Sequence, residues 1–230
     1  MNPSRRDFMR KSTAFGVSSF LPFNNFFLRM NRTIRTAHVG VGGMGLNDLK
    51  AISSHKNVEV TALCDIDSEL LNQALKLFPK AKIFRDYRVL LNSLDNEIDA
   101  VVISTPDHTH GPASIMAMKK GKAIYCQKPL TNNVLEAREM SKISIQKKLV
   151  TQMGIQVHSF YDYKLTKLLI QDGIVGKIHT VRAWCPKNWG FDGKLPKKED
   201  NIPENLDWNL WLGTSPYKNY LENQYHQYNW

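Results

Sequence analysis

Short apolar segments alternate with amphipathic segments between residues 36 and 153, and this alternation predicts a parallel sheet whose strands are joined by helices. The apolar segments are rich in Val, Ile and Ala, as buried parallel strands tend to be. The predicted strands are Thr36–Val41, Val58–Cys64, Ala100–Ser104, Ala123–Cys126 and Leu149–Met153. The predicted helices are Met44–Ser53, Ser68–Phe78, Tyr87–Leu94, Pro112–Lys120 and Asn133–Lys147, with Gly121 as a stop after the fourth. The fold class is therefore α/β, with an N-terminal doubly wound parallel sheet.

The alternation ends near Gly154, and the remaining residues follow a different pattern. A helix at Tyr161–Gln171 and a strand at Lys177–Trp184 are predicted, followed by an irregular region that contains prolines and most of the tryptophans. One helix and one strand cannot close a sheet core, so we expect a second α/β domain of which this chain holds only part. The predicted division is residues 1–31 as a leader, residues 32–150 as the first domain and residues 151–230 as the partial second domain.

The leader begins with Ser4-Arg5-Arg6-Asp7-Phe8, a twin-arginine arrangement, and an uncharged segment follows at residues 12–28. This order is typical of a signal read by the twin-arginine export machinery, which predicts a periplasmic protein; the alternative is a basic tail. The uncharged segment is shorter than the roughly 20 residues of a membrane span. It shows no Ala-x-Ala site, so a removed signal and a retained membrane tether both stay open.

The formal net charge of +10 on 230 residues does not indicate nucleic-acid binding. Residues 1–35 hold seven Lys or Arg and one acid, which leaves only +4 on the rest of the chain. A surplus of this size, without a basic helix or a nucleic-acid motif, is typical of a solvated surface.

The three cysteines, Cys64, Cys126 and Cys185, are widely spaced and form no Cys-x-x-Cys pair. Each lies at or near the end of a predicted strand. Buried thiols are therefore expected rather than a disulfide framework.

The sequence Gly40-Val41-Gly42-Gly43-Met44-Gly45 follows the first predicted strand and opens the first helix. In this context the first glycine permits a tight turn, the second lets the backbone approach a pyrophosphate, and the third lets helix and strand pack closely. The helix N-terminus then favours the negative charge. We predict a Rossmann domain that binds a nicotinamide dinucleotide, with cofactor contacts from Gly40, Gly42, Gly43, Met44 and Gly45.

Asp65 comes directly after the second predicted strand, twenty residues after Gly45. A carboxylate at this place can accept hydrogen bonds from the adenosine ribose hydroxyls. It would also repel a 2′-phosphate, so the predicted cofactor is NAD, with NADP as the alternative.

Two further segments lie at the carboxyl ends of predicted strands, where open α/β sheets bind ligands. The first, residues 104–110, reads Ser-Thr-Pro-Asp-His-Thr-His. Its two histidines have no neighbouring ligand set that would complete a zinc site, so we interpret it as a helix entry that lines the cofactor, with Thr109 as the cap. The second, residues 125–131, contains Lys128, which could bind a substrate hydroxyl and take its proton as hydride leaves the carbon.

Together these segments resemble the glucose-fructose oxidoreductase, inositol dehydrogenase and MocA (Gfo/Idh/MocA) family in its exported branch. The resemblance also rests on Thr151-Gln152-Met153-Gly154 and on Leu206-Asp207-Trp208-Asn209-Leu210-Trp211-Leu212-Gly213, and it covers nearly the whole chain. It implies a two-domain NAD(P)-dependent oxidoreductase acting on a sugar, polyol or derivative. It also implies a C-terminal α/β domain that often mediates oligomerisation, so the full-length protein is expected to be a homo-oligomer.

The resemblance implies roles for several residues. Lys128 matches the lysine of a Glu-Lys-Pro motif, between nicotinamide and substrate, and the Lys128–Pro129 bond is expected to be cis as in the family. Cofactor contacts are implied for Thr105, Pro106, His110 and Gln127, and substrate contacts for Gln156 and His158.

The chain departs from the family pattern in three places. Gln127 stands where most members have Glu, and Ile155 stands where a polar Asn is expected. The resemblance implies that an Asp and a His face the lysine and that both come from family segments after the one matching Asn229-Trp230, so the catalytic set is expected to be incomplete in this chain.

Three functions remain open from the sequence. The first is hydride transfer from an alcohol carbon of a sugar or polyol to NAD. The second is a glycosidase that oxidises a ring carbon transiently and cleaves the glycosidic bond by elimination. The third is a truncated, inactive protein that binds NAD without turnover.

Overall fold

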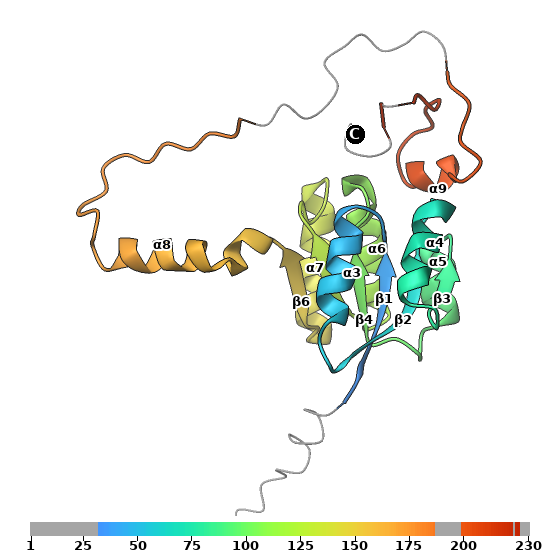
Figure 1. The fold of residues 1–230 in the computed structure, drawn as a ribbon, viewed down its shortest axis with the longest axis horizontal. Coiled ribbons are helices and arrows are strands. Elements are labelled where there is room, and N and C mark those ends of the chain that lie inside the picture. Colours follow the sequence, from blue (N-terminus) through green and yellow to red (C-terminus); the bar gives the residue numbers. More distant parts are fainter. Residues whose placement is uncertain (1–31, 187–198, 223, 226–230) are drawn as a thin grey trace, which may run out of the picture. The chain divides into compact units, whose positions relative to one another are not determined.

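The computed structural model describes residues 32–186, 199–222, 224 and 225, and the twin-arginine leader lies outside this range. Its centre is a six-stranded parallel sheet with the strand order β3-β2-β1-β4-β5-β6 (Figure 1). The strands are β1 (Ile34–Val39), β2 (Val58–Cys64), β3 (Lys82–Phe84), β4 (Ala100–Ile103), β5 (Ala123–Gln127) and β6 (Thr151–Gly154). This order is that of a doubly wound dinucleotide-binding sheet. The predicted fold class of the first domain is confirmed.

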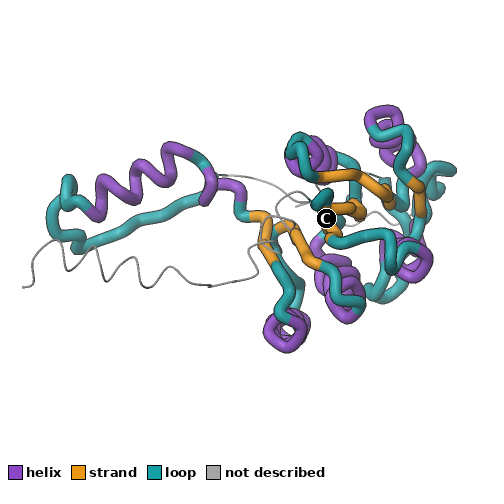
Figure 2. Tube along the Cα trace, turned by 90° about the horizontal axis from the view of Figure 1, so that it is seen from below, coloured by secondary structure: helices purple, strands orange, loops and turns teal. Residues whose placement is uncertain are grey.

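Helices cover both faces of the sheet, as Figure 2 shows. They are α3 (Met44–Ser53), α4 (Ser68–Leu77), α5 (Tyr87–Ser93), α6 (Asp107–Lys119) and α7 (Val134–Lys147). Helices α5, α6 and α7 share one hydrophobic cluster with the sheet, and α3 and α4 share another. Right-handed crossovers between parallel strands place helices in this way.

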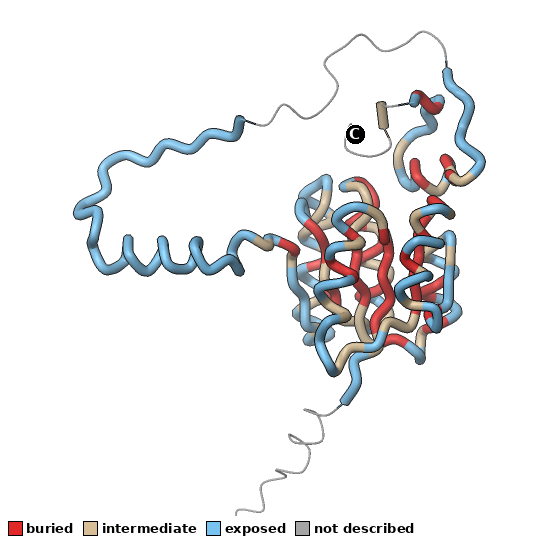
Figure 3. Tube along the Cα trace, viewed as in Figure 1, coloured by how far each residue is buried: buried red, intermediate tan, exposed pale blue. Residues whose placement is uncertain are grey.

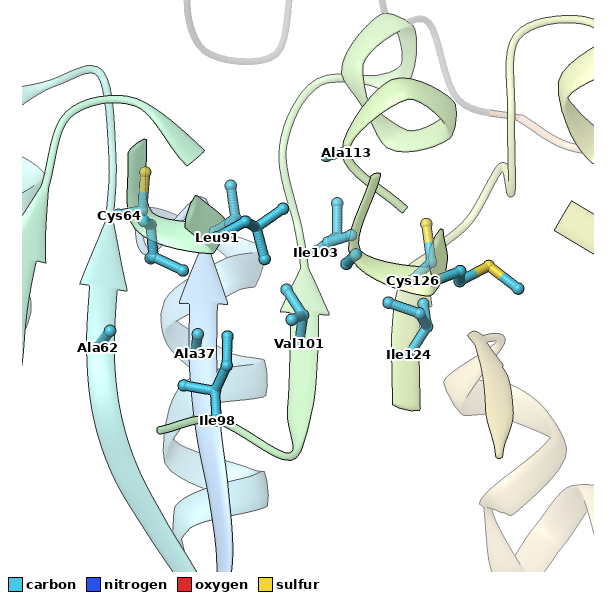
Figure 4. Close-up of a cluster of buried hydrophobic side chains, with 14 of the residues drawn as sticks. Ala37, Ala62, Cys64, Leu91, Ile98, Val101, Ile103, Ala113, Ile124 and Cys126 are labelled. Atoms are coloured by element: carbon cyan, nitrogen blue, oxygen red, sulfur yellow. The ribbon is translucent and has the colours of Figure 1, made fainter. Parts of the chain in front are cut away.

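The larger cluster shows why alternate strand positions are apolar. Val101 and Ile103 of β4, and Ile124 and Cys126 of β5, point to the same face and lie against Ala113 of α6 (Figure 4). Side chains alternate between the faces of a strand, so residues two apart share one core. The buried positions therefore fix the register of the strands.

Most predicted elements are confirmed. Helices at Met44–Ser53 and Tyr161–Gln171 (α8) and the strand at Val58–Cys64 have the predicted bounds, whereas β1 lies two residues earlier than predicted. Gly121, with φ +79°, follows the end of α6 and acts as the predicted stop.

Two predictions about α6 and its surroundings are wrong. The helix begins at Asp107 rather than Pro112, because the turn after Pro106 is already helical and Pro112 is accommodated inside the helix. Thr109 is not its cap: the Thr109 hydroxyl donates to the carbonyl oxygen of Pro106 at 2.9 Å.

The edge strand β3 has no counterpart among the predicted strands.

The prediction of a strand at Lys177–Trp184 is also wrong. Residues 178–186 have no regular structure and are exposed, as is α8 before them (Figure 3). A strand needs a neighbouring strand for its N–H and C=O groups, and none of the described residues supplies one.

The short helix α9 (Trp208–Leu212) is the last element of the described residues. None of the described helices combines the length and apolar character of a membrane span.

The cysteines are free thiols, but only two are buried as predicted. Cys64 and Cys126 are buried, and burial raises the pKa of Cys126 to about 11. Cys185 is exposed because the predicted strand that would have enclosed it does not form.

Candidate functional site

The glycine loop lies close to neighbouring backbone. A Cβ on Gly45 would lie 2.0 Å from the carbonyl oxygen of Gly40, and a Cβ on Gly40 would lie 2.6 Å from that of Ser104. Gly40 also has φ +81°, where side chains are strained. Gly40 and Gly45 therefore bring β1, α3 and the end of β4 together, which is the packing role that the motif predicts.

The N-terminus of α3 is prepared for an anion. Its N-cap, Gly43, provides no side-chain hydrogen bond, and no acidic residue occupies the first turn. The first N–H groups of a helix have no partner within the helix, and together with the helix dipole they attract a phosphate group. The site therefore fits the diphosphate of a dinucleotide.

A cavity of about 310 Å³ opens beside this helix terminus. Seven of the predicted cofactor-binding residues line it: Gly40, Gly42, Gly43, Met44, Asp65, Thr105 and Pro106. They come from the carboxyl ends of β1, β2 and β4, and parallel strands bring such ends to one edge of the sheet. Gly45, His110, Gln127 and Lys128 are not part of its lining.

Asp65 is held rigidly at the edge of this cavity. Its Oδ2 accepts the N–H of Val41 in the glycine loop at 2.8 Å, and its Oδ1 accepts the N–H of Asp67 at 3.0 Å. The side chain is largely buried. The carboxylate thus ties the glycine loop to β2 and forms part of the cavity wall.

His110 connects two parts of the edge instead of lining the cavity. Its Nδ1 lies 2.6 Å from the carbonyl oxygen of Pro129, and its Nε2 lies 2.7 Å from that of Thr105. His110 thus fixes the segment after Lys128 relative to the cofactor loop.

Gln127 is the last residue of β5 and Lys128 follows it, and the two differ in exposure. Gln127 is 5% exposed, whereas Lys128 is exposed at the carboxyl edge of the sheet. The Lys128–Pro129 bond is cis, as expected. The Lys128 Nζ has no hydrogen bond or ion pair with the residues that the structure describes, which leaves it available to a ligand.

The two predicted substrate residues lie in the short 3₁₀ helix η1 (Gln156–Ser159). Gln156 Nε2 lies 3.8 Å from Sδ of Met44, beside the start of α3. His158 is exposed and stacks on Tyr163 with ring centroids 4.9 Å apart. The structure therefore brings Gln156 to the glycine loop and does not bring His158 there.

Two groups of residues at the site were missed from the sequence. Asp48 of α3 is 6% exposed and accepts hydrogen bonds from Ser104 and Gln127. Leu210, Trp211 and Tyr225, far along the chain, line the cavity. No local pattern marks Asp48, and although Leu210 and Trp211 lie in the Leu206–Gly213 segment that resembles the family, their place at the cavity depends on contacts across more than fifty residues.

The His108 side chain has a structural role. Its Nε2 contacts the carbonyl oxygen of Trp211 at 2.6 Å, and burial lowers the pKa of His108. Among the described residues, no cluster of His, Cys, Asp and Glu could hold a metal ion.

Comparison with protein families identifies this arrangement. The family model for the NAD-binding Rossmann fold of the Gfo/Idh/MocA oxidoreductases matches residues 34–155, and that for the C-terminal α/β domain of an oxidoreductase family matches residues 160–229. The chain belongs to the Gfo/Idh/MocA family. Residues 34–155 are its NAD-binding domain.

Several family members resemble this chain in sequence. An inositol 2-dehydrogenase of Rhodococcus jostii is 32% identical over 177 residues, covering 74% of this chain and 48% of the relative. A glycosyl hydrolase family 109 protein of Stenotrophomonas maltophilia is 37% identical over 132 residues, covering 54% of this chain and 29% of the relative. The chain thus spans about half or less of the length of these relatives.

Solved structures of family members agree with the fold. Myo-inositol 2-dehydrogenase from Lactobacillus plantarum matches with a TM-score of 0.60 and 26% identity, covering 64% of this chain and 43% of that chain. The WlbA dehydrogenase from Chromobacterium violaceum, in complex with NADH and UDP-GlcNAcA, matches with a TM-score of 0.56 and 26% identity, covering 63% of this chain and 41% of that chain.

Proposed function

We propose that this chain is the cofactor-binding part, with some of the substrate domain, of an NAD-dependent oxidoreductase that acts on an alcohol group of a sugar, polyol or derivative. The observation that carries the proposal is the position of Lys128. It is an exposed lysine at the carboxyl end of β5, on the sheet edge that holds the dinucleotide site, in a chain 32% identical to an inositol 2-dehydrogenase.

The residues of the chain have separate tasks in this proposal. The glycine loop and the N-terminus of α3 hold the diphosphate, and Asp65 binds the ribose. A nicotinamide bound at this edge would supply the hydride acceptor for the alcohol carbon. Lys128 binds the substrate hydroxyl and takes its proton as the carbonyl forms. Asp65 favours NAD over NADP because a carboxylate repels a 2′-phosphate.

The experiment measures NAD binding by calorimetry and NAD reduction by the absorbance of the reduced nicotinamide, with a panel of inositols, pyranoses and linear polyols. We expect NAD binding by this chain, and turnover of at least one cyclic polyol or sugar by the full-length protein. Binding without turnover on any member would favour an NAD-binding protein without activity. Failure to bind NAD would overturn the proposal.

Lys128→Met tests the role of the lysine. We expect kcat to fall by about 10²-fold or more with NAD affinity unchanged, because the variant loses the proton acceptor but not the cofactor site. Lys147→Met, an exposed lysine at the end of α7, is the matched control and should change neither quantity. Turnover of Lys128→Met within a few-fold of the wild type would show that another group takes the proton.

The second candidate function is NAD-dependent glycosidase activity, favoured by the 37% identity to the glycosyl hydrolase family 109 protein. In this reaction hydride returns to the sugar after elimination, so NADH does not accumulate. Release of free sugar from aryl glycosides without net NADH would identify it. Net NADH from an unglycosylated polyol would identify the dehydrogenase instead.

The twin-arginine motif supports a further proposal, that the protein is exported to the periplasm. The motif residues Arg5 and Arg6 lie outside the described part of the chain. The variant with both arginines replaced by lysine should remain in the cytoplasmic fraction of an expressing cell, whereas the wild type should enter the periplasmic or membrane fraction. Equal distribution of the two would contradict export by this route.

A further inference from the structure

A buried polar cluster lies beneath the carboxyl edge of the sheet and is formed by Asp48, Ser104 and Gln127. Asp48 Oδ2 accepts the hydroxyl of Ser104 at 2.7 Å and the side-chain N–H of Gln127 at 2.8 Å. Asp48 and Gln127 are 6% and 5% exposed. A buried carboxylate needs hydrogen-bond donors in place of water, and these two side chains supply them.

The N–H group and the oxygen of the Gln127 side-chain amide both form hydrogen bonds. While its Nε2 donates to Asp48, its Oε1 accepts the backbone N–H of Lys128 at 3.3 Å. The side chain is also enclosed: a Cβ on Gly154 of β6 would lie 3.0 Å from Gln127 Cδ and 2.9 Å from the Tyr125 hydroxyl. Gln127 therefore connects the buried carboxylate of α3 to the main chain of the exposed lysine.

We infer that Asp48 is a positioning residue, which acts through the Gln127 amide on Lys128, and that Asp48 is the reason this chain has Gln rather than Glu at position 127. A carboxylate at 127 would lie at about the same short distance from Asp48 Oδ2 and could donate nothing to it. Two adjacent buried carboxylates cannot both be ionised. The effect on Lys128 rests on the proposed function, whereas the pairing of Asp48 with Gln127 does not.

The first experiment compares thermal unfolding of the wild type, Gln127→Glu, Asp48→Asn and the double variant between pH 5 and pH 8. Folded Gln127→Glu must keep one proton on the carboxylate pair, so the pair's apparent pKa is raised relative to the unfolded chain and stability is lost as the pH rises. We expect its Tm deficit to grow to on the order of 5 °C at pH 8. In the double variant the amide introduced at position 48 can donate to the carboxylate introduced at position 127, so the deficit and its pH dependence should largely disappear.

Gln152→Glu is the matched control, because it makes the same change at an exposed position of the adjacent strand β6. Its Tm should stay near that of the wild type at every pH. A pH-independent Tm of Gln127→Glu, or a double variant whose deficit is the sum of those of the single variants, would overturn the pairing.

The second experiment measures kcat and the dissociation constant of NAD for the same variants. We expect Gln127→Glu to lower kcat at least tenfold and the double variant to recover most of it, with smaller changes in NAD affinity. An unchanged kcat in Gln127→Glu would contradict the positioning role of Asp48 but not its pairing with Gln127. If the wild type neither binds NAD nor turns over, the proposed function fails, and the unfolding data still decide the pairing.

Discussion

Among single residues, His38 shows how burial changes the charge of a side chain. It is the second-last residue of β1, is 1% exposed, and burial lowers its pKa to about 3. The Thr36 hydroxyl donates to the carbonyl oxygen of Glu59, so it accepts the Nε2–H of His38 at 3.1 Å. His38 Nδ1 has no partner among the described residues. The imidazole is thus neutral in the folded protein.

This neutrality predicts a loss of stability in mild acid. Below pH about 6.5 the unfolded chain gains a proton on His38 that the folded protein does not bind, so the stability falls as the pH decreases from 6.5 towards 3. His38 alone should remove about 2 kcal/mol of unfolding free energy between pH 7 and pH 5. Urea unfolding at a series of pH values measures the loss.

The variant His38→Leu cannot titrate and serves as the comparison. Its unfolding free energy should change much less over the same interval, with a remaining slope from His108, whose pKa burial also lowers. Parallel pH profiles of the two proteins would show that the imidazole is protonated in the folded state.

The role of a residue could be predicted from the sequence where it depends on neighbours close along the chain. Asp65 follows Gly45 by twenty residues, the spacing of a dinucleotide-binding fold, so the sequence indicated that the glycine loop and Asp65 share one site. Asp48 could not be recognised in the same way, because a polar residue on a helix is usually solvated and its partner Gln127 is 79 residues away. The exposed position of Lys128 followed from its place at a strand end.

At the scale of elements, prediction succeeded for segments with a strong hydrophobic period and failed for short or isolated ones. The three residues of β3 (Lys82–Phe84) are too few to show alternation. The segment Lys177–Trp184 has the composition of a strand, but composition does not supply the neighbouring strand that its backbone needs. The start of α6 was misplaced because Pro112 resembles a first-turn proline.

The junction of β1 and α3 gives a prediction in which two glycines behave differently. A Cβ on Gly45 would meet backbone atoms that cannot move away, so Gly45→Ala should lower the unfolding free energy by about 3 kcal/mol. A Cβ on Gly42 would meet Leu70 Cδ1 at 2.5 Å, the end of a flexible side chain, so Gly42→Ala should cost about 1 kcal/mol or less.

A measurement of NAD binding tests whether the glycine loop also lies against the diphosphate. Gly42 lines the cavity, and a methyl group there would occupy the space that a diphosphate approaches. Gly42→Ala should therefore weaken NAD binding at least tenfold by calorimetry although the protein remains folded. Wild-type affinity in Gly42→Ala would place the diphosphate elsewhere.

At the scale of the whole described molecule, residues late in the chain complete the dinucleotide site. Asn205 accepts the N–H of Ser68 through its carbonyl oxygen at 2.9 Å and donates its side-chain N–H to Asp67 Oδ1 at 2.9 Å. Asp207 donates its N–H to the carbonyl oxygen of Ile66 at 3.1 Å. These bonds hold the segment before α9 against the end of β2, next to Asp65.

This docking places Trp211 on the wall of the cavity. Trp211 is 3% exposed, stacks on Trp208 with ring centroids 4.7 Å apart, and lies beside His108. Its ring is therefore rigid, and aromatic rings of this kind bind flat bases well because they lose little conformational entropy. We expect the adenosine half of NAD to pack against this wall, since Asp65 lines the same cavity.

Trp211→Phe tests the contribution of this wall while keeping an aromatic ring in the core. NAD affinity should fall by about three- to tenfold, which corresponds to roughly 1 kcal/mol of aromatic packing. NADH accepts energy from nearby tryptophans, so the quenching of tryptophan emission by bound NADH should also decrease in the variant. The control is Trp184→Phe, because Trp184 is 82% exposed and does not line the cavity, so its affinity should equal that of the wild type. Wild-type affinity and quenching in Trp211→Phe would mean that this wall makes no contact with the cofactor, and the C-terminal segment would then have only a structural role at this edge of the sheet.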